Sequence, residues 1–572
     1  MFYKFTTFKG IAPAVAPRLL NERFGQTAEN IDFESGVLVP IEDDGSSEFT
    51  LQNGLRRSIF LYEDTNWFEW ADENVHAVPG PIANDAFDRV YWTDAAYPKM
   101  STTALAVSGS SGYPATSYRL GIPAPTAAPS ISKSGTASDD EQAISVAYVY
   151  CLVSEFGEEG PPSAASTVET LTSTETITLT LSSGSVPSGN YALSTGALKR
   201  IYRSNTGSNT TEFQFIADVP IATTSYADTT DPAAAGELIP STYWVGPPDD
   251  DSSTYPDGPM AGIIPVGNGI FAGFSGNTIC LSEPFLPHAW PVSYRINTEE
   301  DVVALETTAG GLVGLTDGRP YFISGVDPSA MSAEIIELSQ ACVNEHSVVD
   351  MGSYVLYAGP DGLCAVEANS GQIVSQGVIS PAQWNADFNP TSYRAFRYED
   401  TYVAFYSDGA SEHSGWVFDP RAQDAVFSTL TLSSEVRGGH YDPKTGDLYM
   451  IVGSDIIKYR GGAGKRTLTW RTKELITPHP TDFGWVRVSA EAYPVTVKVY
   501  ADDTLIADYS IAKSGSTYTQ TTTTPGSISP ATLTEPIMRL PATVGQKWEV
   551  EVESANTCLL YTSPSPRDKR QS

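Results

Sequence analysis

The sequence predicts an all-β protein, with a β-propeller of about six blades, an inserted β-sandwich and a C-terminal β-sandwich. Glycine and proline are abundant, with 47 and 40 residues, and aromatic residues make up 11% of the chain. These residue types favour tight turns and strands. Short strand-like runs occur throughout, and no long stretch has the apolar spacing of a helix. At 572 residues the chain is too long for one core, so several domains are expected.

Regularly spaced turn signals predict the propeller between about Met260 and Tyr459. Each repeat has an apolar strand, a turn, a second strand, a turn rich in Asp, Asn or Gly, and a third strand. The turns after the second strands recur at roughly 42–47 residues, the length of one four-stranded blade. These turns are Ser275-Gly276-Asn277, Thr316-Asp317-Gly318, Pro360-Asp361-Gly362, Ser407-Asp408-Gly409 and Gly453-Ser454-Asp455. An irregular sandwich with frequent turns is the alternative.

A further blade is predicted near the N-terminus. Its strands are Ser58–Tyr62, Asn66–Trp70 and Asp88–Trp92, and its first turn is Glu63-Asp64-Thr65. Propellers close by combining strands from both ends of the chain. We therefore assign residues 1–125 to an N-terminal strand segment and the first blade, and residues 241–465 to the other blades.

Residues 126–240 are predicted to form a domain inserted after the first blade. About seven short strands in ~100 residues are typical of a β-sandwich. The strand Arg200-Ile201-Tyr202-Arg203 and the closing Thr224-Ser225-Tyr226-Ala227-Asp228 resemble fibronectin type III modules, which implies that fold for the insert. Runs of Pro, Ala and Asp flank the insert, and one of them, Gly246–Asp251, is interpreted as a linker.

Residues 466–557 are predicted to form a C-terminal antiparallel sandwich. Val495–Tyr500 and Trp548–Glu553 alternate strictly, so that one face is buried and the other is wet. Residues 558–572 do not continue this pattern and resemble one reading frame of a sequencing-library adapter. We interpret them as an artefact outside the fold, which implies that the C-terminal sandwich is truncated.

The formal net charge of −34 disfavours binding to nucleic acid and to anionic membranes. Two roles of this negative charge remain open. It keeps the protein soluble, or it forms a wall past which DNA slides without binding. No run approaches the ~20 apolar residues of a membrane span, and no signal peptide is predicted. The five cysteines form no Cys-x-x-Cys pair. They are predicted to be buried thiols of a protein made in a reducing cytoplasm.

The sequence predicts no catalytic residue, cofactor or metal site. The six histidines lack metal-ligand spacing, and no carboxylate pair has a context typical of a glycosidase. The segment Gly461–Thr467 imitates a phosphate-binding loop. However, Tyr459 and Arg466 stand where that motif needs Gly and Ser or Thr, so we interpret it as a flexible exit from the propeller. Asp249–Asp251 and Asp257 lack the spacing of a calcium loop, and a solvated linker is the favoured interpretation.

Trp67 and Trp70 are the candidate site residues, as anchors of a protein interface. Both lie in the strand Asn66–Trp70, and we expect their rings to share one face of it. Tryptophan is enriched among residues that dominate binding energy. Packing within the blade is the alternative role.

The N-terminal residues resemble a family of viral proteins. Phe8-Lys9-Gly10-Ile11-Ala12-Pro13 is followed by Ala28-Glu29-Asn30 and by an acidic strand that ends in Gly36-Val37-Leu38-Val39-Pro40. This pattern resembles the start of nozzle and tail-hub proteins of short-tailed bacteriophages. Residues 280–291 and 316–321 also resemble phage tail proteins. The fibronectin-like insert departs from the pattern and leaves the position in the tail open: nozzle, hub or fibre adaptor.

The resemblance implies a structural virion protein and not an enzyme. Its relatives form a ring, commonly a hexamer, at the distal tail, and DNA passes through that ring without specific binding. The expected partners are adaptor, fibre or tail-tube proteins, with assembly in the host cytoplasm and no membrane insertion. Two alternatives remain open, a receptor- or glycan-binding adhesin of the virion and a propeller glycosidase.

Overall fold

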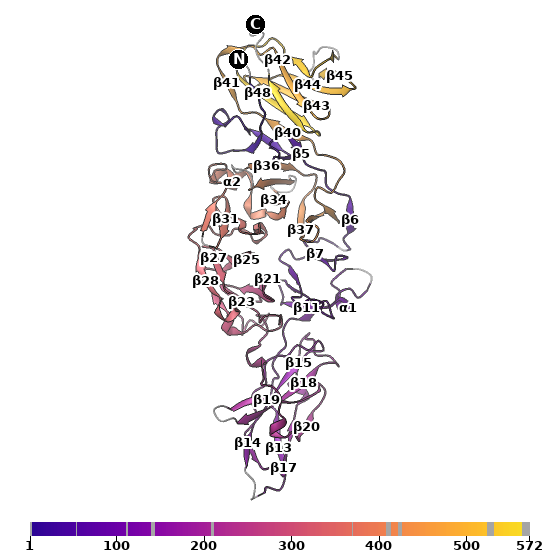
Figure 1. Ribbon diagram of the computed structural model, residues 1–572, viewed down its shortest axis with the longest axis vertical. Coiled ribbons are helices and arrows are strands. Elements are labelled where there is room, and N and C mark those ends of the chain that lie inside the picture. The colour runs from indigo at the N-terminus through magenta and orange to yellow at the C-terminus, as the bar shows by residue number, and fades with distance from the viewer. Residues whose placement is uncertain are drawn as a thin grey trace. The chain divides into compact units, whose positions relative to one another are not determined.

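The computed structural model of this chain consists mainly of strands (Figure 1), which confirms the all-β prediction. It describes residues 3–52, 54–109, 112–138, 143–206, 211–368, 370–407, 413–420, 426–522 and 531–562. The chain divides into two compact units. Unit 1 comprises Met1–Ile59, Gly318–Pro320 and Ile336–Ser572, and unit 2 comprises Phe60–Asp317 and Tyr321–Ile335. The segment 1–125 and the segment 241–465 therefore each contribute to both units.

Unit 2 contains three four-stranded antiparallel sheets in which spatial order follows chain order. The first has β9 (His76–Pro79), β10 (Val90–Thr93), β11 (Lys99–Ser101) and β12 (Tyr118–Arg119). The second has β21 (Ala261–Gly267), β22 (Ile270–Ser275), β23 (Thr278–Leu281) and β24 (Ile296–Asn297). The third has β25 (Val302–Thr308), β26 (Gly311–Thr316), β27 (Tyr321–Ser324) and β28 (Ser332–Ile335). Strands β9 and β10 contact β21, and β21 and β22 contact β25, so the sheets pack in sequence.

Unit 1 contains one more sheet of this kind, a set of four such strands within a longer sheet, and a sheet whose fourth strand comes from another part of the chain. The first has β29 (Val349–Asp350), β30 (Val355–Ala358), β31 (Leu363–Glu367) and β32 (Ser370–Ile373). The second set is β33 (Arg394–Tyr398), β34 (Thr401–Ser407), β35 (His413–Asp419) and β36 (Val426–Thr431). The third has β37 (Val436–Asp442), β38 (Asp447–Val452), β39 (Asp455–Lys458) and, from far along the chain, β6 (Ser47–Thr50). Strand β33 contacts both β29 and β37.

The predicted turns lie where the repeat requires them. Each follows the second strand of a sheet and precedes the third, as between β22 and β23 or between β38 and β39. Asp408 and Gly409 of the fourth turn lie outside the described residues. The spacing of apolar strands and turns therefore predicted the strand order correctly, and four of the five turns lie wholly within the described residues.

The predicted N-terminal blade is wrong as a single sheet. Strands β7 (Ser58–Tyr62) and β8 (Asn66–Trp70) form a hairpin of their own, and β10 pairs with β9 and β11. The short strand β9 was not recognised from sequence. The N-terminal strand that joins a repeat sheet is β6, which pairs antiparallel with β39.

The insert has two main sheets that share one core. One is β13 (Ser130–Gly135), β17 (Glu175–Thr180) and β20 (Ser225–Asp228), and the other is β15 (Tyr148–Val153), β18 (Leu198–Thr206) and β19 (Thr211–Pro220). A small pair, β14 (Ile144–Val146) and β16 (Glu169–Leu171), completes it. Ile177 and Leu179 from the first sheet pack with Tyr148, Tyr150 and Ile201 from the second.

The C-terminal region is antiparallel, as the alternating pattern predicts. Its strands are β40 (Leu468–Arg471), β41 (Leu475–Thr481), β42 (Trp485–Ala490), β43 (Val495–Ala501), β44 (Thr504–Ser514), β45 (Thr517–Thr522), β46 (Ala531–Leu533), β47 (Ile537–Arg539), β48 (Gly545–Ser554) and β49 (Cys558–Thr562). The valines of β43 are buried against Val550 and Val552 of β48.

The segment that begins at residue 558 lies partly within the fold, in contrast to the sequence prediction. Cys558–Thr562 form β49, which pairs antiparallel with β42. Cys558 is buried and exchanges main-chain hydrogen bonds with Leu38. The exclusion of these five residues from the fold is therefore wrong, whereas the origin of the segment stays a prediction. Residues 563–572 lie outside the described part of the chain.

The N-terminal segment contributes five short strands to unit 1, namely β1 (Lys9–Ile11), β2 (Phe24–Gly25), β3 (Thr27–Glu29), β4 (Ile31–Asp32) and β5 (Val39–Pro40). We call residues 8–44 the strap. Strand β3 pairs with β36 on one side and with β40 on the other, so one sheet runs from β33 through the strap to β46. Figure 1 shows β36, β40 and β48 following one another in unit 1.

The helices are few and short. They are α1 (Thr103–Ala106), α2 (Pro381–Asp387) and the 3-10 turns η1 (Pro17–Leu19), η2 (Ser183–Ser185), η3 (Pro232–Ala234), η4 (Ser241–Tyr243), η5 (Val292–Tyr294), η6 (Pro328–Ala330), η7 (Glu345–Ser347) and η8 (Pro390–Ser392). Ser380 and Gln383 form a capping box at α2, and Trp384 anchors it in the core. None of the helices in the described ranges is long and apolar enough to cross a membrane.

Candidate functional site: two polar junctions

The strap lies close against the main chain of neighbouring strands in unit 1, and two positions in it require particular residue types. A Cβ atom on Gly10 would lie 1.9 Å from the carbonyl oxygen of Phe427, so only glycine fits beside β36. Asn30 adopts a positive φ of 55° and is buried. Its amide donates to Thr431 and to the Thr467 carbonyl, and its oxygen accepts from the Thr431 N–H. These contacts explain why Gly10 and Asn30 stand in the N-terminal pattern.

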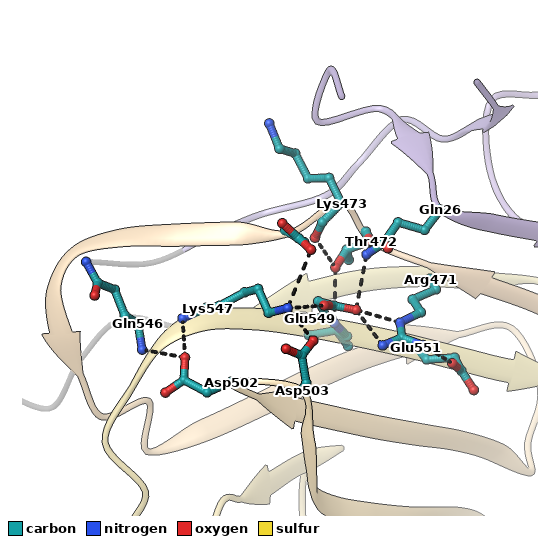
Figure 2. A network of polar contacts seen from close by, with 12 residues as sticks. Gln26, Arg471, Thr472, Lys473, Asp502, Asp503, Gln546, Lys547, Glu549 and Glu551 are labelled. Atoms are coloured by element: carbon teal, nitrogen blue, oxygen red, sulfur yellow. Dashed lines mark hydrogen bonds and ion pairs between the residues drawn. The ribbon is translucent and has the colours of Figure 1, made fainter. Parts of the chain in front are cut away.

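A polar network joins the strap to the C-terminal sheet, and we call it the strap junction (Figure 2). Oε2 of Glu549 accepts hydrogen bonds from Arg471 Nε at 2.6 Å and from Gln26 Nε2 at 3.1 Å. The same Gln26 amide also donates to the Thr472 carbonyl at 2.8 Å. The Arg471 guanidinium lies 4.2 Å from the ring centroid of Tyr500. Glu549 is 3% exposed, so its charge is compensated by fixed partners and not by water.

The strap junction continues along one face of β48, where acidic residues alternate with buried apolar ones. Lys498 on the neighbouring strand contacts Glu551 at 3.0 Å and also pairs with Glu553. Lys547 pairs with Asp503 and lies 3.5 Å from Glu474. Burial acts to lower the pKa of Lys498, but hydrogen bonds with Glu553 and Glu551 outweigh it and raise that pKa. This part of the strap junction is thus a set of charge-assisted hydrogen bonds and ion pairs.

The second junction, in unit 2, joins the insert to its neighbouring sheets, and we call it the insert junction. The chain enters the insert past Gly121 and leaves it past Gly246. Gly121 has a φ of +98°, and a Cβ there would lie 2.8 Å from the Gly246 Cα. Close approach and positive φ both require glycine at position 121. Phe156 of the insert packs edge-on against Phe87, with ring centroids 4.9 Å apart.

A buried ion pair lies at the insert junction. Arg89 Nη1 donates to Glu158 Oε1 at 2.8 Å, and Arg89 Nε donates to Asp85 Oδ2 at 2.7 Å. The side chains of Arg89 and Glu158 are 9% and 5% exposed. Burial alone would lower the pKa of Arg89, but the Asp85 hydrogen bond and the nearby acids raise it. The Arg89 guanidinium therefore stays charged, and its contact with Glu158 joins the sheet of β9–β12 to the insert.

Glu159, the next residue, is a buried carboxylate with three donors. Its oxygens accept from Tyr202 at 2.8 Å, from Ser241 at 2.6 Å and from Arg200 at 2.9 Å. Arg200 in turn makes two hydrogen bonds of 2.9 Å with Asp218. These groups are fully engaged with one another, so the cluster fixes geometry and offers no free general acid or base.

His288 is buried at the same junction, and its Nε2 has no hydrogen-bond partner among the described residues. Burial lowers its pKa, and the charge of Arg89 acts in the same direction. The charges of Glu158 and Glu159 and a hydrogen bond with the Glu159 main chain act in the opposite direction. The imidazole is therefore held neutral beside an ion pair.

Ion pairs attach both the linker Gly246–Asp251 and the phosphate-like loop Gly461–Thr467 to neighbouring segments. Arg119 makes hydrogen bonds of 2.7 and 3.1 Å with Asp250, so the linker run is tied to β12. In the loop, Lys465 pairs with Glu42, and Arg466 contacts Asp44 at 2.7 Å. Partial burial would raise the pKa of Glu42, but hydrogen bonds from Lys465 and Arg460 lower it to about 2. The interpretation of a flexible exit from the propeller is therefore wrong, because acids of the strap hold this loop.

Trp67 and Trp70 do not share a face. Residues three apart in a strand point to opposite sides of it. Trp67 is 8% exposed, whereas the Trp70 ring packs half-buried against Phe68 and Trp92 at 5.9 and 6.0 Å. Core packing accounts for most of both rings, and their role as interface anchors remains a prediction.

Other expectations of the sequence analysis concern sulfur and metals. All five cysteines are free and buried, as predicted. Within the part of the chain that the structure describes, no group of three or more His, Cys, Asp and Glu side chains is placed to hold a metal ion.

Sequence reasoning missed the residues that make both junctions. The alternation in Trp548–Glu553 predicted a wet face, which is wrong for Glu549 and Glu551, because both are buried. Cationic partners from other strands, Arg471 and Lys498, cover them, and residue spacing did not reveal these partners. Nothing in the local sequence marks Arg89 or Glu158, which are 69 positions apart. Comparison with protein-family models finds no match for this chain, and comparison with curated proteins finds none either.

Proposed function

We propose that this chain is a structural subunit of a bacteriophage tail, of nozzle or hub type, with its four-stranded sheets as successive blades of one β-propeller. The observation that carries the proposal is a repeated antiparallel arrangement of four strands. Among the described residues, four such sheets follow chain order, a fifth adds β6 to β37–β39, and β33–β36 repeat the order within a longer sheet. Within each unit, consecutive meanders pack against one another. A wall of this kind is stiff and leaves few open strand edges.

The two junctions support a mechanical role. Each attaches a sandwich to the meander sheets through groups that are already saturated with fixed partners. Such groups hold a shape and are poorly suited to proton transfer. The residues of the phage-like pattern, Gly10 and Asn30, serve the strap that joins the sheets of unit 1. In this proposal the chain has no catalytic activity.

Charge supports passage of DNA without binding. With a net charge of −34, copies of the chain in a ring would offer DNA few phosphate contacts, so that DNA slides freely. Lateral contacts between copies would be heterologous and close into a ring, of six subunits if it follows the nozzle proteins that the N-terminal pattern resembles. The insert, which we take to be fibronectin type III-like, would contact fibre or adaptor proteins of the virion tail, assembled in the host cytoplasm.

Particle analysis tests this proposal. The purified chain is examined by light scattering with size-exclusion chromatography and by negative-stain electron microscopy, and phage particles are searched for it by mass spectrometry. Closed rings and a place in the tail are expected. A chain that stays monomeric at high concentration and is missing from the particles contradicts the proposal.

A second candidate, a receptor- or glycan-binding adhesin of the virion, is favoured by one specific observation. A trough of about 420 Å³ lies on one face of the β29–β32 sheet and combines aromatic, apolar and polar side chains. No comparable observation favours a glycosidase, because the buried carboxylates Glu158, Glu159 and Glu549 are tied to fixed cations.

A further inference from the structure

The trough in unit 1 is lined largely by one face of the sheet β29–β32, with Val366 and Ile373 of the alternate positions also at its wall. Leu356 of β30 pairs with Ala365 of β31, and Ala365 pairs with Gln372 of β32, so these side chains form one row across the sheet. Glu367 lies two positions along β31 on the same face. Phe418, at the end of β35, lines the trough as well. The small side chain of Ala365 leaves space between bulkier neighbours.

The lining combines an apolar floor with polar groups at its margin. Leu356 and Phe418 are buried, whereas Gln372 and Glu367 are exposed and Tyr354 is half-buried. Among the described residues, neither the Tyr354 hydroxyl nor the Gln372 amide makes a hydrogen bond. Ser370 donates to Glu367 at 3.0 Å, which leaves the second carboxylate oxygen of Glu367 open to a further donor.

We propose that this trough binds a short neutral saccharide. Its volume of about 420 Å³ lies within the usual range of ligand pockets, about 300–1,000 Å³. A sugar presents an apolar C–H face, which fits the Tyr354 ring and the floor, and hydroxyls that can both donate and accept. The Gln372 amide, the Glu367 carboxylate and the Tyr354 hydroxyl supply the matching acceptors and donors.

Charge selects a neutral ligand over an anionic one. Glu367 lines the trough, and the charges of Asp400 and Asp419 act on Tyr354 from nearby. One cation, Arg397, also acts on Tyr354, but it is paired with Asp400 at 2.5 Å. Among the described residues that line the trough, Glu367 is the one charged side chain, and it would repel a sialylated or phosphorylated ligand.

Saturation-transfer NMR and calorimetry on the full chain test this inference. The probes are maltose, cellobiose and lactose, a sialylated lactose, and a blocked four-residue peptide. We expect one or more neutral disaccharides to bind at millimolar concentration and the sialylated sugar not to bind. The Ala365→Phe variant fills the space and should weaken binding more than tenfold. The Gln372→Ala variant should weaken it by about fivefold, the worth of one hydrogen bond.

A matched control is Gln376→Ala, an exposed glutamine of the same segment that does not line the trough. It should bind as the unchanged chain does. The inference would be overturned if none of the neutral sugars binds. It would also be overturned if Ala365→Phe and Gln372→Ala bind the sugar as tightly as the unchanged chain does. Binding of the peptide alone, lost in Ala365→Phe, would assign the trough to a strand segment of another protein. The site does not depend on the tail proposal, since a monomeric chain that binds sugar contradicts only the latter.

Discussion

The strap junction and the insert junction attach a sandwich by different physical means. In unit 1 the main chain of β3 is hydrogen-bonded to both β36 and β40, and the ion pairs of Glu549 add to that pairing. In unit 2 the attachment relies on side chains, above all Arg89 and Glu158, and on the close passage of Gly121 and Gly246. Main-chain pairing distributes stability over many groups, whereas a buried ion pair concentrates it in two.

The difference predicts where each attachment is fragile. Removing one side chain should damage the insert junction severely, because the partner charge stays buried without compensation. The strap junction should tolerate loss of a side chain. It should be sensitive instead to a substitution that adds an atom between the paired strands and pushes them apart.

The largest expected effect is that of Arg89→Leu. It leaves Glu158 and Asp85 buried without their cation, which should lower the free energy of unfolding of unit 2 by roughly 3–5 kcal/mol. Urea unfolding followed by tryptophan fluorescence measures the change. The double variant Arg89→Leu with Glu158→Leu removes both charges and should recover most of the loss. Equal destabilisation by the single and double variants would mean that packing, and not charge, holds this junction.

Gly10→Ala should have the next largest effect. The added Cβ would meet the Phe427 carbonyl at 1.9 Å and push β1 away from β36, at a cost of about 1–3 kcal/mol in the stability of unit 1. Thermal unfolding by circular dichroism gives the measurement. Gly54→Ala is a control for the loss of chain entropy at a glycine outside the strap. A Cβ at Gly54 would meet no atom within 4 Å, although its φ of +68° adds some strain. Unchanged stability in Gly10→Ala would show that β1 does not need its place beside β36.

These two sites also show what the sequence could and could not predict. The meander was predictable because strand, turn and strand follow within a few residues, so that every signal is local. Gly10 and Asn30 were recognisable as a pattern, but not as contacts, because Phe427 and Thr431 lie about four hundred positions away.

The junction side chains were beyond prediction for a related reason. Arg89 looks like any loop arginine until the fold places Glu158 beside it, and a strand acid such as Glu549 looks solvated until Arg471 and Gln26 cover it. The error on Trp67 and Trp70 was different, since the alternation of a strand already separates them. Pairings distant in sequence depend on tertiary register, which residue spacing does not specify.

Glu549→Ala should have a moderate effect, smaller than that of Arg89→Leu. Gln26 and Arg471 lose their acceptor, but Arg471 lies 3.9 Å from Glu551 and can turn to it, and the β3–β40 pairing remains. A loss of about 1–2 kcal/mol in the stability of unit 1 is expected. Hydrogen exchange of residues 26–30 reports on the strap directly. Full exchange of these amides in the variant would show that side chains, and not the main chain, secure the strap.

The smallest expected effect is a difference in pH response between the junctions. The pKa of His288 is lowered in the folded state. Its contribution to the free energy of unfolding is therefore complete above the unfolded pKa of about 6.5 and is lost as the pH falls toward the folded pKa. Lys498 has a raised pKa, so its contribution is complete below about 10.4 and is lost only in alkali. Acidification from pH 7 to 5 should therefore loosen residues 154–160 and spare residues 26–30, as measured by rate-corrected hydrogen exchange. His288→Asn should flatten the response of residues 154–160, whereas an equal acid response in both segments would assign it to groups outside the junctions.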